Sequence, residues 1–168
     1  LENRGTGVWS AGGIELNGGA LAGSGRIVNA AGASLDMQAA LTVFASNRGG
    51  TDNGSDALVQ NLGTLSRSTG GGTATIFARL DSSGTLDVKS GTLSLAGGGS
   101  LSGSVKTATT STVLFSGGTH TIDAAATLDL QGTLQVSAGT VNVNGTIGGG
   151  TGVVKLSGGT LAANGSFS

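Results

Sequence analysis

The sequence predicts an all-β protein, a right-handed parallel β-helix with three faces, and three observations support this prediction. Short units that begin with Gly and then Thr or Ser recur about every seven residues. Apolar and polar residues alternate within each unit, which is the period of a half-buried strand. No stretch shows sustained helical periodicity. A short repeat of this kind buries its apolar side only by stacking on its neighbours, as in a solenoid.

The repeat unit consists of a small residue, Thr or Ser, and then an aliphatic residue. It is present at Gly63-Thr64-Leu65, Gly84-Thr85-Leu86, Gly91-Thr92-Leu93, Gly132-Thr133-Leu134, Gly139-Thr140-Val141, Gly145-Thr146-Ile147 and Gly159-Thr160-Leu161, with Ala33-Ser34-Leu35 and Gly99-Ser100-Leu101 as variants. In the unit after Gly84, alternation places Leu86 and Val88 inward and Asp87 and Lys89 outward. Each strand is therefore about four or five residues long, and Gly permits the positive φ angles of the bends between strands.

Three faces of about seven residues give a coil of about 20–22 residues. The chain of 168 residues then holds about 7–8 coils, and at the usual strand separation they form a rod about 35–40 Å long. The crossover preference of parallel strands predicts right-handed coiling. We expect residues 1–168 to form one β-solenoid domain, a fragment of a longer protein. A run without apolar residues predicts a loop insertion at about 45–57.

Charge and hydropathy argue against two classes of partner. The chain has 8 Lys and Arg against 9 Asp and Glu, a net charge of −1, and the basic residues are scattered. Binding to a nucleic-acid backbone needs clustered basic residues, so no nucleic acid is expected as a partner. No apolar run approaches the roughly 18 residues of a membrane span, so none is expected in this fragment. No signal peptide opens the sequence, and any export signal is expected outside it.

Three stretches of the chain resemble the repeats of a known class of exported proteins, namely residues 84–99, 115–122 and 139–145. They are similar to the passenger-domain β-helix repeats of bacterial autotransporters and to filamentous-haemagglutinin-like adhesins. The resemblance implies an extracellular location at the bacterial cell surface, with attachment to the outer membrane through parts outside this fragment. It implies cell-surface or matrix glycans or proteins as partners. It brings no catalytic residues and no cofactor.

The titratable residues were weighed as candidate catalytic groups. His120 is the only histidine, and the alternation with Ile122 places it inward or at a bend, which favours a structural role. Asp87 and Asp129 occupy equivalent outward positions, and on one face they would lie about 10 Å apart, near the separation of an inverting glycosidase pair. No Lys or Arg set is evident beside them in the sequence. We therefore expect no enzyme here.

Two further ligand classes were considered. The segment around Asp52 and Asp56 partly resembles a Ca²⁺-binding nonapeptide, but such motifs bind metal only in tandem, so we expect solvated carboxylates and no metal site. Thr-x-Thr occurs at 73–75, 107–109 and 119–121. A regular threonine array of this kind could bind ice, but the spacing is irregular, and ordinary outward strand threonines are the preferred interpretation.

Trp9 and several asparagines are expected to be structural. Trp9 is the only tryptophan and is predicted to pack near the first coil rather than to stack on a sugar. Asparagines near bends are expected to stack as side-chain amide ladders, and the candidates are Asn29, Asn61, Asn142 and Asn144.

The sequence thus favours a structural or interaction segment of an exported bacterial adhesin-like surface protein. Such a segment acts as a rigid rod or spacer with weak multivalent contacts. One alternative is a filament subunit that stacks end to end, since neither end has an evident charged or helical cap. Another is a polysaccharide-degrading enzyme or a glycan-binding module on a β-helix scaffold.

Overall fold

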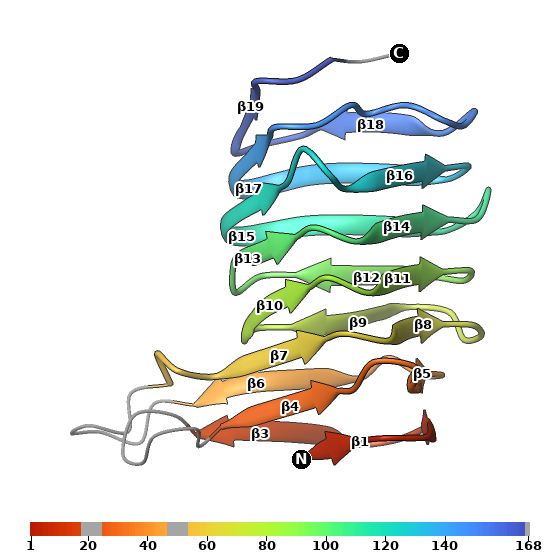
Figure 1. Ribbon diagram of the computed structural model, residues 1–168, viewed down its shortest axis with the longest axis vertical. Coiled ribbons are helices and arrows are strands. Elements are labelled where there is room, and N and C mark those ends of the chain that lie inside the picture. Colours follow the sequence, from red (N-terminus) through yellow and green to blue (C-terminus); the bar gives the residue numbers. More distant parts are fainter. Residues whose placement is uncertain (18–24, 47–53, 167–168) are drawn as a thin grey trace.

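The computed structural model describes residues 1–17, 25–46 and 54–166, and it confirms the predicted fold class. The described residues form no helix, and every pair of hydrogen-bonded strands is parallel. The strands stack on one another as a β-solenoid (Figure 1). The handedness and the number of coils stay predictions.

Three faces surround one core. The first face contains β1 (Glu2–Asn3), β4 (Arg26–Asn29), β7 (Leu58–Asn61), β10 (Arg79–Ser82), β13 (Gly99–Leu101), the second halves of β15 (Thr112–Ile122) and β17 (Thr133–Val143), and β19 (Thr160–Ala163). The second face contains β2 (Thr6–Trp9), β5 (Ser34–Met37), β8 (Thr64–Arg67), β11 (Thr85–Val88), β14 (Ser104–Thr107) and β16 (Thr127–Leu130). The third face contains β3 (Gly13–Asn17), β6 (Thr42–Ser46), β9 (Thr73–Ile76), β12 (Thr92–Leu95), the first halves of β15 and β17, and β18 (Val153–Leu156).

The strand register gives the length of each coil. On the second face Thr64 pairs with Thr85, Thr85 with Ser104, and Ser104 with Thr127, which are steps of 21, 19 and 23 residues. These steps bracket the predicted 20–22 residues. Two earlier steps on the first face, Asn3 to Asn29 and Asn29 to Asn61, are longer, at 26 and 32 residues.

The predicted loop insertion at 45–57 lies in the second of these long steps. β6 ends at Ser46 and β7 begins at Leu58. Residues 47–53 of the predicted loop lie outside the described residues. At its end, Ala57 is buried and its backbone N–H donates to the carbonyl oxygen of Gly54 at 3.1 Å.

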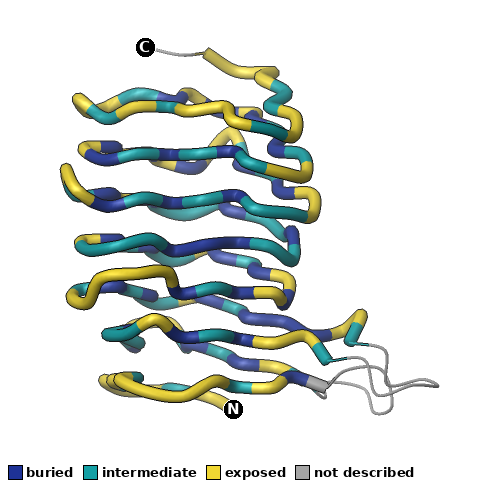
Figure 2. The backbone as a smooth tube through the Cα atoms, turned by 180° about the vertical axis from the view of Figure 1, so that it is seen from behind, coloured by how far each residue is buried: buried dark blue, intermediate teal, exposed yellow. Residues whose placement is uncertain are grey.

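The core is built from columns of aliphatic side chains in register. On the second face Leu65, Leu86, Val105 and Leu128 stack in successive coils, and each is at most 6% exposed. Figure 2 shows these buried positions alternating with more exposed ones along the strands. Burial of each such side chain contributes about 1.5–3 kcal/mol, so the predicted inward assignment of Leu86 and Val88 is confirmed.

The glycine of the repeat unit has two different roles. Gly91, Gly139 and Gly159 have positive φ, as predicted. Gly84 does not, and a Cβ there would lie 2.0 Å from the carbonyl oxygen of Gly63. At such corners glycine is needed because the backbones of successive coils approach too closely for any side chain.

A buried asparagine ladder runs along the corner of the first face. Asn3 Nδ2 donates to Asn29 Oδ1 at 2.8 Å, and Asn29 Nδ2 donates to Asn61 Oδ1 at 2.8 Å. The ladder continues from Asn61 Nδ2 to Ser82 Oγ at 2.9 Å. The prediction is thus confirmed for Asn29 and Asn61, which are 1% and 0% exposed.

The other two predicted ladder residues behave differently. Asn142 lies opposite Thr121 and Ala162 in the strand register, so it has no asparagine neighbour in its column. Asn144 accepts a hydrogen bond from Asn164 Nδ2 at 3.0 Å, in an exposed pair. The prediction of a ladder is wrong for Asn142, because the residues equivalent to it in adjacent coils are not amides.

Candidate functional site

The second face carries a column of polar and charged side chains. Asp36, Ser66, Asp87, Lys106 and Asp129 follow one another in register. Asp87 and Asp129 therefore lie in one column two coils apart, as the sequence suggested. The expectation that no basic residue lies beside them is wrong, because Lys106 pairs with both and Lys89 Nζ lies 3.2 Å from Asp87 Oδ2.

This charge order has a chemical consequence. Opposite charges on adjacent strands stabilise a sheet, and here a lysine separates the two carboxylates. An inverting glycosidase pair instead needs open space between its carboxylates for a water molecule and a sugar ring. The column formed by Asp87, Lys106 and Asp129 is arranged for mutual charge compensation.

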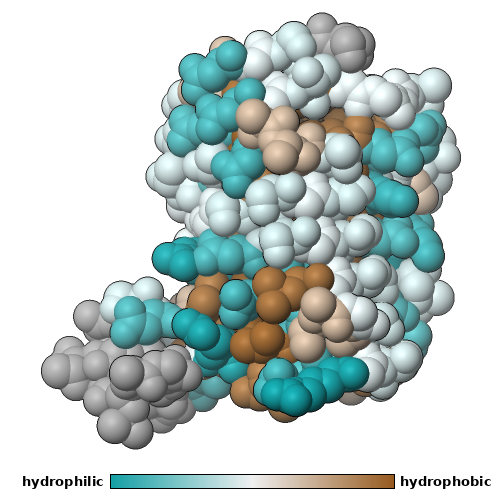
Figure 3. All heavy atoms as spheres, viewed as in Figure 1, coloured by the Kyte–Doolittle hydropathy of each residue, from teal (hydrophilic) through white to brown (hydrophobic). Residues whose placement is uncertain are grey.

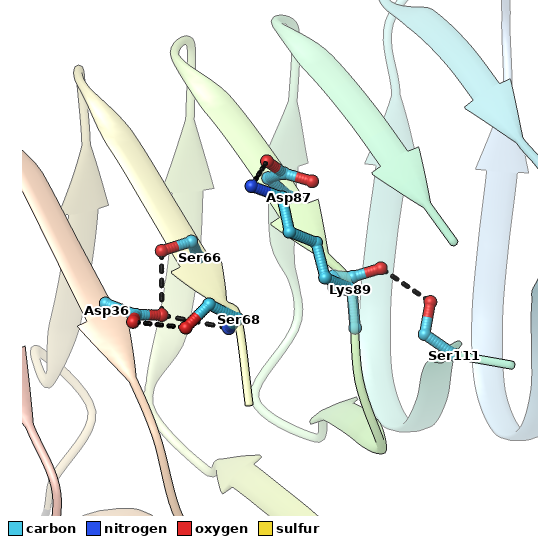
Figure 4. Close-up of polar contacts among 7 residues, drawn as sticks. Asp36, Ser66, Ser68, Asp87, Lys89 and Ser111 are labelled. Atoms are coloured by element: carbon cyan, nitrogen blue, oxygen red, sulfur yellow. Dashed lines mark hydrogen bonds and ion pairs between the residues drawn. The ribbon is translucent and has the colours of Figure 1, made fainter. Parts of the chain in front are cut away.

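Asp36, at the lower end of the column, is held by a dense set of hydrogen bonds (Figure 4). Its Oδ1 accepts from Ser66 Oγ and from the Ser68 backbone N–H, both at 2.9 Å, and its Oδ2 accepts from Ser68 Oγ at 2.5 Å and Gln38 Nε2 at 2.8 Å. Desolvation acts to raise the pKa of Asp36, but hydrogen bonds from Ser68, Gln38 and Ser66 outweigh it, so the pKa is lowered. The carboxylate is fixed in place as a structural group.

His120 points into the core, which confirms the sequence-based expectation. It is 1% exposed and lies between Gly99 and Val141 in the strand register. Its Nε2 is 3.0 Å from the Gly117 carbonyl oxygen, its ring packs edge-on against Phe115, and Nδ1 has no hydrogen-bond partner. Desolvation lowers the pKa of His120, only partly opposed by contacts with the backbone of Gly117 and Leu95.

Arg67 is a buried cation that sequence reasoning missed. Its side chain is fully buried, and it pairs in register with Val88 on the inward side of the second face. The guanidinium donates to the carbonyl oxygens of Ala39, Gly71 and Gly72. Desolvation lowers the pKa of Arg67, while Asp36 opposes this change. Arg67 thus ties together two chain corners that lie between the second and third faces.

The calcium and threonine candidates give no site among the described residues. Asp52 lies outside them, Asp56 is exposed, and in the rest of the chain no three His, Cys, Asp or Glu side chains cluster to hold a metal. Thr107, expected to face outward, is 3% exposed, and its Oγ1 accepts from the Gly132 N–H at 3.0 Å. That expectation is wrong for Thr107 because the β14 alternation places it inward.

The threonines of the third face form a column that sequence spacing did not reveal. Thr73, Thr92, Thr112 and Thr133 are paired in consecutive coils. The neighbouring outward positions on the same strands hold Thr75, Ser94, Leu114 and Gln135. These mixed residues break the regular two-column threonine array that ice binding would require.

The N-terminal end contains an open apolar hollow of about 280 Å³. Leu1, Trp9, Ile14, Ile27 and Leu35 contribute to its lining. Gly7 creates part of the space, because the positions equivalent to it in later coils hold Leu35 and Leu65. Trp9 packs against the core and donates from Nε1 to the Ala11 carbonyl oxygen at 2.8 Å, as expected for a packing role.

A second, polar hollow of about 150 Å³ lies on the first face. Its lining consists of Gln60, Leu62, Asp81, Ser82, Ser83, Ser100 and Ser102. Sequence reasoning did not single out these residues, since they come together only through the coil register.

The comparisons with known proteins leave the chain without an assigned family. The described residues contain no helix that is long and apolar enough to span a membrane. No protein-family model, no curated protein and no solved structure matches this sequence.

Proposed function

We propose that the chain is a rigid rod or spacer segment of an exported bacterial adhesin-like surface protein. It holds a more distal surface away from the cell and makes weak, multivalent contacts with glycans or proteins along its faces. The proposal assigns no catalytic reaction and no cofactor to the chain.

The observation that carries this proposal is the continuous register of the coils. From Leu58 onward, successive strands of each face pair without interruption, over a core of stacked aliphatic side chains. Each coil contacts its neighbours above and below, so the stack resists bending in the way a spacer requires. The outward positions are small and polar over most of this length, which suits a solvated surface.

Small-angle scattering of the purified chain across a range of concentrations tests the proposal. A spacer predicts an elongated particle whose mass and cross-section stay constant with concentration. A compact sphere, or a particle that unfolds on dilution, would contradict it. Binding of the labelled chain to glycan and matrix-protein arrays then measures the contacts along its faces.

End-to-end self-assembly is a second candidate, favoured by the apolar hollow at the N-terminal end. β1, β2 and β3 each pair on one edge only, with β4, β5 and β6. The exposed Val8 on β2 and Leu156 on β18 place apolar side chains at the two opposite ends of the stack. A strand edge with one free side is a template for another chain, and head-to-tail contacts of this kind build open filaments.

Charge substitution at the N-terminal end separates the two candidates. Assembly through the ends predicts growth in mass with concentration that Val8→Lys abolishes. Phe77→Lys is the matched control, because Phe77 is also exposed, at 49% against 60% for Val8, but lies on the third face away from both ends. Growth that persists in the Val8 variant, or stops in both variants, would rule out assembly through this end.

A further inference from the structure

The polar hollow on the first face has the composition of a hydrogen-bonding site. Gln60, Asp81 and Ser100 stack in register in three consecutive coils. Leu62, Ser83 and Ser102 follow these strands at equivalent corner positions, since their backbone N–H groups donate to the coil below. An amide, a carboxylate and several hydroxyls thus surround one space of about 150 Å³.

Small side chains at the corner create this space. Ser82 and Ser83 stand at the coil end where the earlier coil has Asn61 and the larger Leu62. Gly84 and Gly103 follow, and no side chain fits at either position, because a Cβ there would lie about 2 Å from a backbone oxygen of the coil below. The hollow is therefore a consequence of the backbone packing and is not filled by a neighbouring side chain.

The carboxylate of Asp81 is fixed from both sides. Its Oδ2 accepts from Arg79, and its Oδ1 accepts from the Ser100 N–H at 3.2 Å and from Ser100 Oγ at 3.3 Å. A carboxylate has about four acceptor positions, so one position on Oδ2 stays open to an incoming hydroxyl group. Within the described part of the chain, the side chains of Gln60, Ser83 and Ser102 make no hydrogen bond to protein atoms.

We propose that this hollow binds one sugar unit of a neutral glycan. Adjacent hydroxyl groups of a sugar match the acceptor of Asp81, the amide of Gln60 and the hydroxyls of Ser83 and Ser102, which both donate and accept. Leu62, which is 39% exposed, offers an apolar surface for the C–H side of the ring. Figure 3 shows apolar residues gathered on the lower coils of this face, next to polar ones. The inference rests on the proposed function and names the ligand class of its contacts.

The charge of the hollow selects neutral over acidic sugars. Asp81 is its only ionisable lining residue. Its partner Arg79 lies on the same strand, two residues before it, and is already engaged in the ion pair. A carboxylate or sulfate on the ligand would meet Asp81 without a free cation to compensate it, so acidic glycans are disfavoured.

Titration of the ¹⁵N-labelled chain with defined oligosaccharides tests the assignment. Cellotetraose, maltotetraose and chitotetraose serve as neutral probes, and tetragalacturonic acid serves as the acidic one. We expect millimolar binding of at least one neutral probe, with shift changes confined to the amides of Gln60, Ser83 and Ser102. Asp81→Asn combined with Gln60→Ala should weaken that binding about tenfold or more, because it removes a charged acceptor and an amide.

A matched control uses Asp87→Asn combined with Gln135→Ala. Asp87 is an outward aspartate paired with Lys89 two residues away, as Asp81 is with Arg79, but it lies on the second face. This variant should bind the neutral probe with unchanged affinity. The proposal is overturned if no neutral probe binds, if tetragalacturonic acid binds best, or if both double variants lose affinity equally. Scattering of the same samples keeps the rod proposal separate, since a rod that binds no glycan sinks only the sugar site.

Discussion

Asn29 donates a hydrogen bond from its side-chain amide to the side-chain carbonyl of Asn61, 2.8 Å away, in a fully buried corner between two faces. Each amide of this ladder also donates to a backbone carbonyl, that of Thr64 for Asn29 and that of Thr85 for Asn61. The side chains thereby satisfy backbone groups at a corner where the strands of two faces diverge.

Asn61→Ala should therefore be strongly destabilising. It leaves the Asn29 amide and the Thr85 carbonyl without partners inside the protein, and each buried group without a partner costs about 1–3 kcal/mol. We expect a loss of about 3 kcal/mol in the free energy of unfolding, measured by denaturant titration with circular dichroism. Asn142→Ala, at a partly exposed position on the same face, should change stability by less than about 0.5 kcal/mol. Equal losses in both variants would contradict the ladder.

Leu93→Asp tests the inward and outward assignment on the third face. Leu93 is 2% exposed and pairs in register with Ala74 and Val113. A carboxylate there has no partner in an apolar core, so cooperative folding should be lost. Lys89→Ala removes an exposed side chain from a surface ion pair and should cost about 0–1 kcal/mol. Thermal melts of both variants provide the measurement, and similar melting temperatures would show that the assignment is incorrect.

His120 should make the stability of the chain depend on pH near neutrality. Its folded-state pKa is lowered by desolvation, while the unfolded chain has the ordinary value of about 6.5. The unfolded state therefore binds the proton more tightly, and stability falls as pH drops below about 6.5 towards the folded-state pKa. His120→Leu should remove this decline, which melting temperatures between pH 7.5 and 5 would reveal. A decline of the same size in the variant would assign the effect to other groups.

Asp36 should act in a separate, more acidic range. Its folded-state pKa lies below the ordinary value of about 3.9, so its contribution to stability is complete above that value and is lost as pH falls through the folded-state pKa. Asp36→Asn should lower stability at pH 7 by about 1 kcal/mol, since the site is partly solvated and screened. The difference between wild type and variant should shrink at pH 2–3. A constant difference over this range would mean that the carboxylate charge is not what the hydrogen bonds stabilise.

The fold was predictable because the alternation of apolar and polar residues is read directly from the sequence. Leu86, Val88 and Leu93 are all buried as that alternation predicts. The coil length was predictable from Leu58 onward for the same reason, since the repeat units there carry an almost constant spacing. The alternation also placed His120 inward correctly.

The site features were less accessible because they depend on register between coils. Steps of 19 and 23 residues adjoin each other at Ser104, so a uniform spacing cannot show that Lys106 lies between Asp87 and Asp129. Arg67 escaped notice for a different reason. A cation is expected outside, and its burial depends on the carbonyl groups of Gly71 and Gly72, whose orientation is set by the bend. The polar hollow likewise appears only when three coils are superposed.

The strands of β15 and β17 run without a break from the third face into the first, with β15 pairing with β12 through residues 112–115 and with β13 through residues 120–122. Hydrogen bonds between coils are directed along the rod, perpendicular to the strands. Under tension applied at its two ends, the molecule should therefore yield like a zipper, one coil at a time, and a coil of about 20 residues would release roughly 70 Å of chain. Because β15 and β17 join two faces, each of these coils should detach as one mechanical unit, which gives the rod stepwise extensibility.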